Sequence, residues 1–208
     1  MNFRLYPLVL SSALLCGVLG CARAELEPEL ARQGLTTYAD IAQAGYEDAL
    51  AGAQQLQQRI QALLDAPSEG TLQAARDAWR AARVPYLQTE TYRFYGGPID
   101  KVELLVNTWP IDESYVDALI DDPAQELSAG LLVQRNAQAG ETSISTGYHV
   151  LEYLLWGRDE DASGAGKRPA SDFLHERRRR YLTLASELLV EHLAQVAGAW
   201  RGAYREAL

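Results

Sequence analysis

A long run of apolar residues at helical spacing constrains the fold of this chain more than any other feature. Between Leu35 and Leu64, apolar or small side chains recur every three or four positions, which is the pattern of a helix with one buried face. The sequence Ala66-Pro67-Ser68-Glu69-Gly70 ends this pattern. The stripe consists of Tyr38, Ile41, Ala42, Gly45, Ala49, Ala53, Leu56, Ile60 and Leu63. No segment of useful length alternates as a β-strand would, so the sequence predicts an all-α, antiparallel up-and-down helical bundle.

Further helices are predicted after the first. The second helix runs from about Thr71 to Phe94 and ends at Gly96-Gly97-Pro98. Shorter helical or irregular pieces cover Val102–Asn107 and Glu113–Ile120, because prolines interrupt the pattern between and after them.

The C-terminal part is predicted to hold two more helices. One spans about Ser143 to Trp156, with Ser143 or Ser145 as its N-cap and Gly157 as its end. A mobile loop rich in Gly, Asp and Ala follows over Arg158–Ser171. The last helix runs from about Ser171 to Glu206 and should bury Phe173, Tyr181, Leu184, Leu188, Leu193, Val196 and Trp200.

Residues 1–24 have the pattern of a bacterial secretory signal peptide. Arg4 gives a thin positive start, and the apolar Leu5–Leu19 is short for a membrane span. Ala22-Arg23-Ala24 fits ordinary signal peptidase, whereas Val18-Leu19-Gly20-Cys21 resembles the box before a lipidated Cys21. Both alternatives stay open. Both predict an exported helical domain over residues 25–208, in the periplasm or anchored to the outer membrane as a lipoprotein.

The charge and the cysteines of the predicted exported domain limit its partners. The whole chain has a formal net charge of −9, and removal of residues 1–24 makes it more acidic because Arg4 and Arg23 are lost with no acid. An acidic domain is a poor nucleic-acid binder, so we expect no nucleic-acid partner and no membrane contact except through a lipid anchor. Cys16 and Cys21 both lie in the targeting segment, which leaves no disulfide and no thiolate metal ligand for the domain.

His149 and Glu152 are the first candidate site. At a spacing of three on a helix their side chains share one face, about 60° apart. An imidazole and a carboxylate that converge form half of a metal site or an acid/base pair. The alternative is a local hydrogen bond on a helix surface. The surrounding helix is strongly apolar, with Leu151, Leu154 and Leu155, and partly buried ionisable groups need a partner or a ligand.

The second predicted helix carries charged residues in its apolar stripe. At about 100° per residue, Trp79, Arg83, Tyr86, Glu90 and Phe94 fall within about 80° of one another. Arg83 and Glu90 should therefore face the core. They could form a buried ion pair, or Glu90 could face His149 and Glu152 across the bundle while Arg83 orients a carboxylate.

One imidazole and two carboxylates suit iron, and less selectively zinc, copper or manganese. Together, His149, Glu152 and Glu90 could form such a metal site, with Asp112 and Asp100 as further candidate ligands. His175 and His192 are isolated on the last helix and are expected to be surface or core histidines. The run Arg177-Arg178-Arg179-Arg180 could suggest an anion or membrane patch, but consecutive residues point around a helix, so we expect a solvated segment.

Three blocks of the sequence are similar to one known family. Gly147-Tyr148-His149-Val150-Leu151-Glu152 resembles the Gly-x-His-x-x-Glu signature of the imelysin family. The segment with Tyr86 and Glu90 resembles the family's Tyr-x-x-x-Glu helix, and Asn107-Thr108-Trp109-Pro110 resembles its Asn-x-Trp-Pro turn. The resemblance covers the predicted exported domain and only the front half of the family pattern.

This resemblance implies a metal-binding role in iron acquisition at the bacterial cell envelope, with other envelope iron-uptake proteins as partners. It favours Glu90, His149 and Glu152 as ligands of one metal ion. An alternative is a metallopeptidase, because the founding imelysin is classed as an insulin-cleaving enzyme. The chain lacks the second histidine of His-Glu-x-x-His and His-x-x-Glu-His sites, since Tyr153 follows Glu152, so we expect a binding protein more than an enzyme. A structural bundle that docks to another envelope protein is the third alternative.

Overall fold

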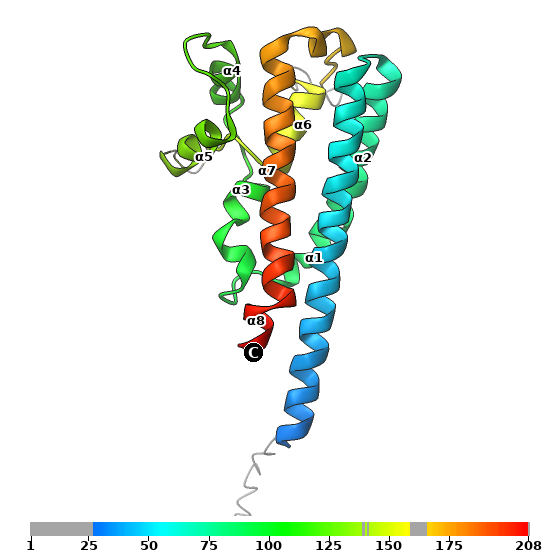
Figure 1. Ribbon diagram of the computed structural model, residues 1–208, viewed down its shortest axis with the longest axis vertical. Coiled ribbons are helices and arrows are strands. Elements are labelled where there is room, and N and C mark those ends of the chain that lie inside the picture. Colours follow the sequence, from blue (N-terminus) through cyan, green and yellow to red (C-terminus); the bar gives the residue numbers. More distant parts are fainter. Residues whose placement is uncertain (1–26, 139, 141, 159–165, 208) are drawn as a thin grey trace, which may run out of the picture.

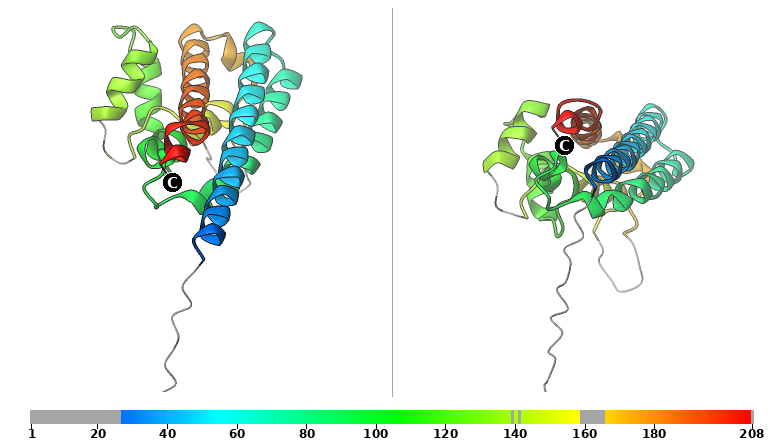
Figure 2. Two further views of the ribbon diagram at one scale, coloured as in Figure 1. Left: turned by 60° about the horizontal axis from the view of Figure 1, so that its bottom comes forward. Right: turned by 90° about the horizontal axis from the view of Figure 1, so that it is seen from below.

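The computed structural model describes residues 27–138, 140, 142–158 and 166–207. In this part of the chain three long helices form the frame: α1 (Pro28–Asp65), α2 (Glu69–Gln88) and α7 (Glu176–Arg201). α1 lies between α2 and α7 and runs antiparallel to both (Figures 1 and 2). The described residues form helices and turns and no strand, so the predicted all-α bundle is confirmed.

Shorter elements cover this frame. α6 packs against both α2 and α7, while α4 and α5 lie on the side of α7 that is remote from α2 (Figure 1). The short elements are η1 (Thr89–Tyr92), η2 (Pro98–Lys101), α3 (Glu103–Asn107), α4 (Glu113–Asp121), α5 (Ala129–Gln138), α6 (Tyr148–Trp156), η3 (Ala170–Leu174) and α8 (Ala203–Glu206), where η denotes a 3₁₀ helix.

Some predictions concern residues that the structure does not describe. The signal peptide over residues 1–24, with Cys21, lies outside the described residues, and so does the 159–165 part of the predicted loop. Across the described ranges, every helix is too short or too polar to cross a membrane.

The buried face of α1 follows a strict three-four spacing. Its core positions are Ala39, Ala42, Tyr46, Ala49, Ala53, Leu56, Ile60 and Leu63, and Leu64 is buried next to the last of them. The small residues let α2 approach closely, because a Cβ added to Gly52 would lie only 3.1 Å from the Cα atom of Ala82. Ile41, which was predicted to belong to the stripe, is exposed, since it is one residue out of step with this spacing. Tyr46 fills the position that the prediction missed.

α2 ends earlier than the sequence predicts. The helix stops at Gln88 and continues as the 3₁₀ turn η1, where the hydroxyl group of Thr89 donates to the carbonyl of Tyr86 at 2.7 Å. Such a local side-chain bond competes with helical backbone pairing. Phe94 then has a positive φ of 70° and is exposed, so it does not extend the helix as predicted.

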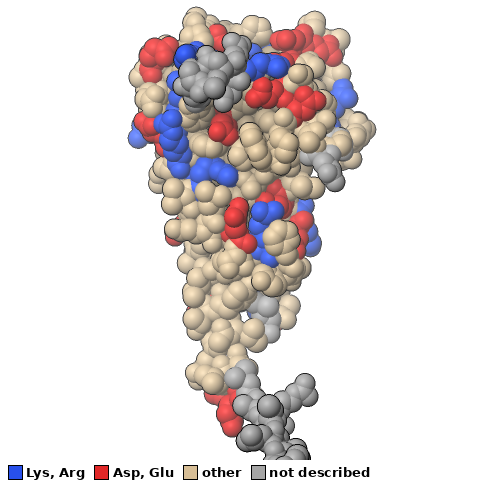
Figure 3. Space-filling model, turned by 180° about the vertical axis from the view of Figure 1, so that it is seen from behind, with Lys and Arg blue, Asp and Glu red and all other residues tan. Residues whose placement is uncertain are grey.

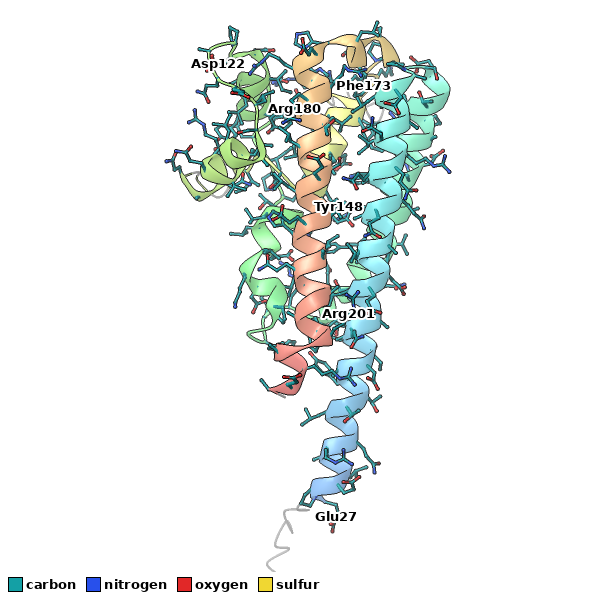
Figure 4. All side chains as sticks on the ribbon, in the orientation of Figure 1. Glu27, Asp122, Tyr148, Phe173, Arg180 and Arg201 are labelled. Atoms are coloured by element: carbon teal, nitrogen blue, oxygen red, sulfur yellow. The ribbon has the colours of Figure 1, made fainter. Side chains whose placement is uncertain are left out.

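The last predicted helix is correct in its core and wrong at its ends. All seven positions expected to be buried, from Phe173 to Trp200, are buried. η3 precedes α7, and the chain bends at Gly202 before α8, so the single predicted helix is divided. His175 caps α7, its Nδ1 accepting from the backbone N–H of Arg178, whereas His192 is buried. Figure 4 shows Phe173 near one end of the bundle and Tyr148 between the long helices.

The arginine run at the start of α7 is only partly solvated, which corrects that prediction, because Arg180 is exposed and the three arginines before it are half-buried. Arg177 donates to the carbonyls of Leu119 and Ile120 at the end of α4 and to that of Gln125. Arg179 donates to the last turn of α1, and Arg180, labelled in Figure 4, to the carbonyl of Leu127. Helix ends leave carbonyl groups without helical partners, and these long side chains satisfy them.

Candidate metal site in a tryptophan-lined cleft

The start of α6 depends on Gly147. This residue has a φ of 96°, and a Cβ built on it would lie 2.7 Å from the carbonyl oxygen of Val106 and 2.8 Å from that of Leu105. Only glycine fits such a close approach to the end of α3. The predicted caps Ser143 and Ser145 lie before the helix begins, and Ser145 instead bonds to Asn136 with both its backbone N–H and its hydroxyl. Gly147 therefore fixes where the first turn of α6 places its side chains.

His149 and Glu152 meet on α6 as their spacing predicts. The Nδ1 atom of His149 lies 2.8 Å from Oε2 of Glu152, and the two side chains are 15% and 39% exposed. When Nδ1 carries the proton and donates it to the carboxylate, the lone pair of Nε2 is left for a ligand. This is the arrangement by which a carboxylate orients a metal-binding histidine. Glu152 can therefore act as an orienting group as well as a direct ligand.

The pair lies in the wall of a cleft of about 390 Å³. Trp79, Trp109 and Trp156 line this cleft, together with Arg80, Ile111, Glu113, His149, Glu152, Tyr153, Gly157 and Gly166. Trp79 is fixed by a 2.8 Å hydrogen bond from its indole N–H to the carbonyl of Tyr148. Trp109, in contrast, is 69% exposed as a residue, and the centroid of its ring lies 4.8 Å from that of His149.

Tyr153 places a hydroxyl group in the cleft wall. Its hydroxyl group donates to Oδ2 of Asp117 at 2.6 Å. Burial, and next the neighbouring carboxylate of Asp117, raise the pKa of Tyr153 to about 12. Without a metal ion, the phenol therefore keeps its proton at neutral pH and donates it to Asp117.

Glu90 does not join the pair, contrary to the prediction. It lies in η1, exposed to solvent, and its nearest opposite charge is Arg93 at 3.8 Å. Because α2 ends at Gln88, the helical stripe that would have turned Glu90 toward the core stops before it. Among the residues that the structure describes, no three His, Cys, Asp or Glu side chains are grouped closely enough to hold a metal ion.

Asp112 and Asp100, the two further candidate ligands, bond to backbone groups. Asp112 is the N-cap of α4 and accepts from the N–H groups of Ser114 and Tyr115 at 3.0 and 3.2 Å. Asp100 accepts from the N–H groups of Gly96 and Phe94 at 2.9 and 3.3 Å. Both carboxylates hold local turns.

Arg83 faces the core as predicted, but its partner is an amide and not a carboxylate. It donates to Oδ1 of Asn107, and its guanidinium lies 5.0 Å from the centroid of the Tyr148 ring. Asn107 in turn donates to Glu103 at 3.4 Å. Arg83 thus ties α2 to α3 beside the start of α6.

Glu103 is the largely buried carboxylate that sequence reasoning missed. Its side chain is 12% exposed, accepts from the Tyr86 hydroxyl at 2.6 Å and pairs with Arg93 at 3.1 Å. Burial, and next the charge of Glu103, raise the pKa of Tyr86, which therefore remains a donor. The i, i+4 spacing of Glu103 and Asn107 was the available signal, because it places both on one face of α3.

The face opposite that of Figure 1 carries acidic and basic side chains side by side over its broad end (Figure 3).

The fold and the site together define a class of protein: an all-α bundle with a Gly-x-His-x-x-Glu helix against its long helices. The imelysin family model matches residues 42–208, and the chain belongs to the imelysin family.

One curated relative and two solved structures extend this result. The chain is 32% identical to iron-regulated protein A of Synechococcus elongatus over 117 residues, which are 55% of this chain and 28% of that protein. It shares its fold with an iron-regulated protein A precursor from Parabacteroides distasonis, with a TM-score of 0.71 and 21% identity over 89% of this chain and 51% of that one. An imelysin-like protein from Psychrobacter arcticum gives a TM-score of 0.62 and 24% identity over 85% and 52%. The chain thus spans about half the length of these solved structures and less of the curated relative.

Proposed function

We propose that this imelysin-family chain binds a metal ion, with iron as its cargo, and serves iron acquisition in the bacterial cell envelope alongside other envelope iron-uptake proteins. The observation that supports the site is the His149–Glu152 pair, 2.8 Å apart in the wall of the cleft. The name of the curated relative, iron-regulated protein A, supports iron over other metals. The signal-peptide pattern of residues 1–24 supports export.

The donor atoms of the pair fit this cargo. A neutral imidazole nitrogen and a carboxylate oxygen suit iron, and less selectively zinc, copper or manganese. Both cysteines lie in residues 1–24, so the domain that follows offers no thiolate to favour softer ions. His149 would bind through Nε2, with Glu152 orienting the ring or adding an oxygen.

Binding is preferred here to peptide hydrolysis. A hydrolytic zinc site usually has three protein ligands, an open position and a separate base. The described wall of the cleft supplies the His149–Glu152 pair and the carboxylate of Glu113, and these do not form a three-ligand group.

Isothermal titration of the 208-residue chain with ferrous, ferric, zinc and copper ions tests this proposal. His149→Ala should weaken binding at least 100-fold or so, and Glu152→Gln by roughly 10–100-fold, as losing a ligand or its orienting carboxylate does. Glu90→Ala is the matched control, because this exposed carboxylate lies outside the cleft and should leave the affinity unchanged. If His149→Ala binds the metal as tightly as wild type, the metal lies elsewhere. If Glu90→Ala loses as much affinity as His149→Ala, the three-ligand arrangement predicted from the sequence is correct.

A further inference from the structure

The cleft around His149 is larger than a bare metal ion requires. Its volume of about 390 Å³ lies within the roughly 300–1,000 Å³ of small-molecule sites. A water molecule takes about 30 Å³, so an ion with a few waters would fill less than half of this space. The His149–Glu152 pair also leaves most positions of a six-coordinate ion open to other donors. The size and the open positions both indicate a ligand that carries its own oxygen donors.

Aromatic rings form the walls of this space. Three of the four tryptophans of the chain line it. Trp79 and Trp156 contact each other edge to face, with centroids 5.4 Å apart, and Trp156 is almost fully buried. Trp109 completes the wall beside His149 and is itself a largely exposed residue. A largely exposed indole beside fixed rings is a surface on which a flat aromatic group can stack.

The charges at the cleft fit a weakly cationic or neutral ligand. Glu113 and Glu152 contribute two carboxylates, of which Glu113 has Arg158 at 4.0 Å. The guanidinium of Arg80 lies 5.1 Å from the centroid of Trp156 and pairs with Asp77 outside the cleft. A ferric ion that holds one catecholate carries a single positive charge, which suits a wall with this slight acidic excess.

We propose that the cleft takes its metal as an aromatic chelate of the catecholate type, with the aromatic ring against Trp109 and an open metal position filled by Nε2 of His149. This inference rests on the proposed metal-binding function and specifies the class of its cargo. The binding step is ligand exchange: a water leaves the ion as the imidazole nitrogen enters, and no electron is transferred.

Tryptophan fluorescence and the visible absorption band of the ferric complex can follow binding of two probes. The first is ferric ion with one equivalent of catechol, and the second is ferric ion with nitrilotriacetate, an aliphatic chelator. The catecholate complex should bind the 208-residue chain about 2- to 10-fold more tightly, in line with the free energy of an aromatic contact. Trp109→Ala should remove this preference. Zinc binding to the same variant reports separately any effect that loss of the Trp109–His149 ring contact has on the metal site, because zinc brings no aromatic ring. Phe94→Ala, an exposed aromatic residue outside the cleft, is the control and should change neither probe.

Two outcomes would overturn the proposal. In one, the two ferric complexes bind wild-type protein and Trp109→Ala with equal affinity. In the other, catechol without metal binds as tightly as its ferric complex, which would make the cleft a site for an aromatic ring alone. Failure of the underlying metal site looks different, because zinc and ferric probes would then bind with the same affinity to wild type and to His149→Ala.

Discussion

Gly147 has a backbone conformation and surroundings that other residues do not fit. Because it has no Cβ, its backbone can lie against the carbonyl oxygens of Val106 and Leu105. This contact sets the start of α6 and hence the position of His149. Gly147→Ala should destabilise the fold by about 2 kcal/mol or more, from the positive φ and the clash together. The change in the free energy of unfolding can be measured by urea titration monitored with circular dichroism. Gly198→Ala is the matched control: it lies on the exposed side of α7 with open space around it, and should stabilise by about 0.5–1 kcal/mol. Unchanged stability of Gly147→Ala would contradict the role given to this glycine.

His192 makes the stability of the fold sensitive to acid. The side chain is buried, and burial lowers its pKa below the usual 6.5, with Glu191 opposing the shift. Below about pH 6.5 the unfolded chain therefore binds a proton at this residue that the native state does not, so stability falls as the pH falls. Titration of His192 lowers the free energy of unfolding by at most about 1.4 kcal/mol per pH unit. The free energy of unfolding, measured at pH 7.5 and 5.5, should decrease less in His192→Gln than in wild type. Gln195→Ala, an exposed substitution without a titratable group on the same helix, should behave as wild type, and an equal decrease in all three proteins would refute the assignment.

At the scale of elements, the interiors of the helices could be predicted from sequence and their ends could not. Three-four spacing identifies the buried faces of α1 and α7 because it is repeated over many turns. Ends are decided by single local bonds, such as the hydroxyl of Thr89 on the carbonyl of Tyr86 or the backbone approach at Gly147. The end of α2 at Gln88, two residues before Glu90, was enough to remove that carboxylate from the predicted site.

The arginines at the start of α7 join helices whose contacts the sequence does not reveal. Arg177 donates to three carbonyl groups, two of them at the end of α4. Arg177→Met should leave these carbonyl acceptors without side-chain partners and lower the local free energy of unfolding by about 1.5–3 kcal/mol. Amide hydrogen exchange over Glu113–Leu127 should become faster, while exchange in the middle of α1 stays unchanged. Arg32→Met, which removes an exposed pair with Glu29, is the control and should alter neither region. Uniform acceleration along the whole chain would show that Arg177 supports the global fold and not this local contact.

At the scale of the whole molecule, the candidate site combines a local pair with distant walls. The His149–Glu152 pair could be predicted because it lies within one helical turn. The cleft could not, because Trp79 comes from α2, Trp109 from the loop after α3 and Trp156 from the end of α6. The packing of α6 against α2 and α3 brings these elements together. Glu103 shows the same limit, since its bonds to Tyr86 and Arg93 join α3 to residues outside that helix.

Anomalous diffraction from crystals of the 208-residue chain soaked with zinc or ferrous ion tests the central claim most directly. The account predicts an anomalous peak in the cleft, about 2.0–2.2 Å from Nε2 of His149, with the carboxylate of Glu152 either on Nδ1 or on the metal. The peak should disappear in His149→Ala crystals and remain in Glu90→Ala crystals. A peak on Glu90, Asp100 or Asp112 away from the cleft, or a cleft peak that persists without His149, would contradict the account.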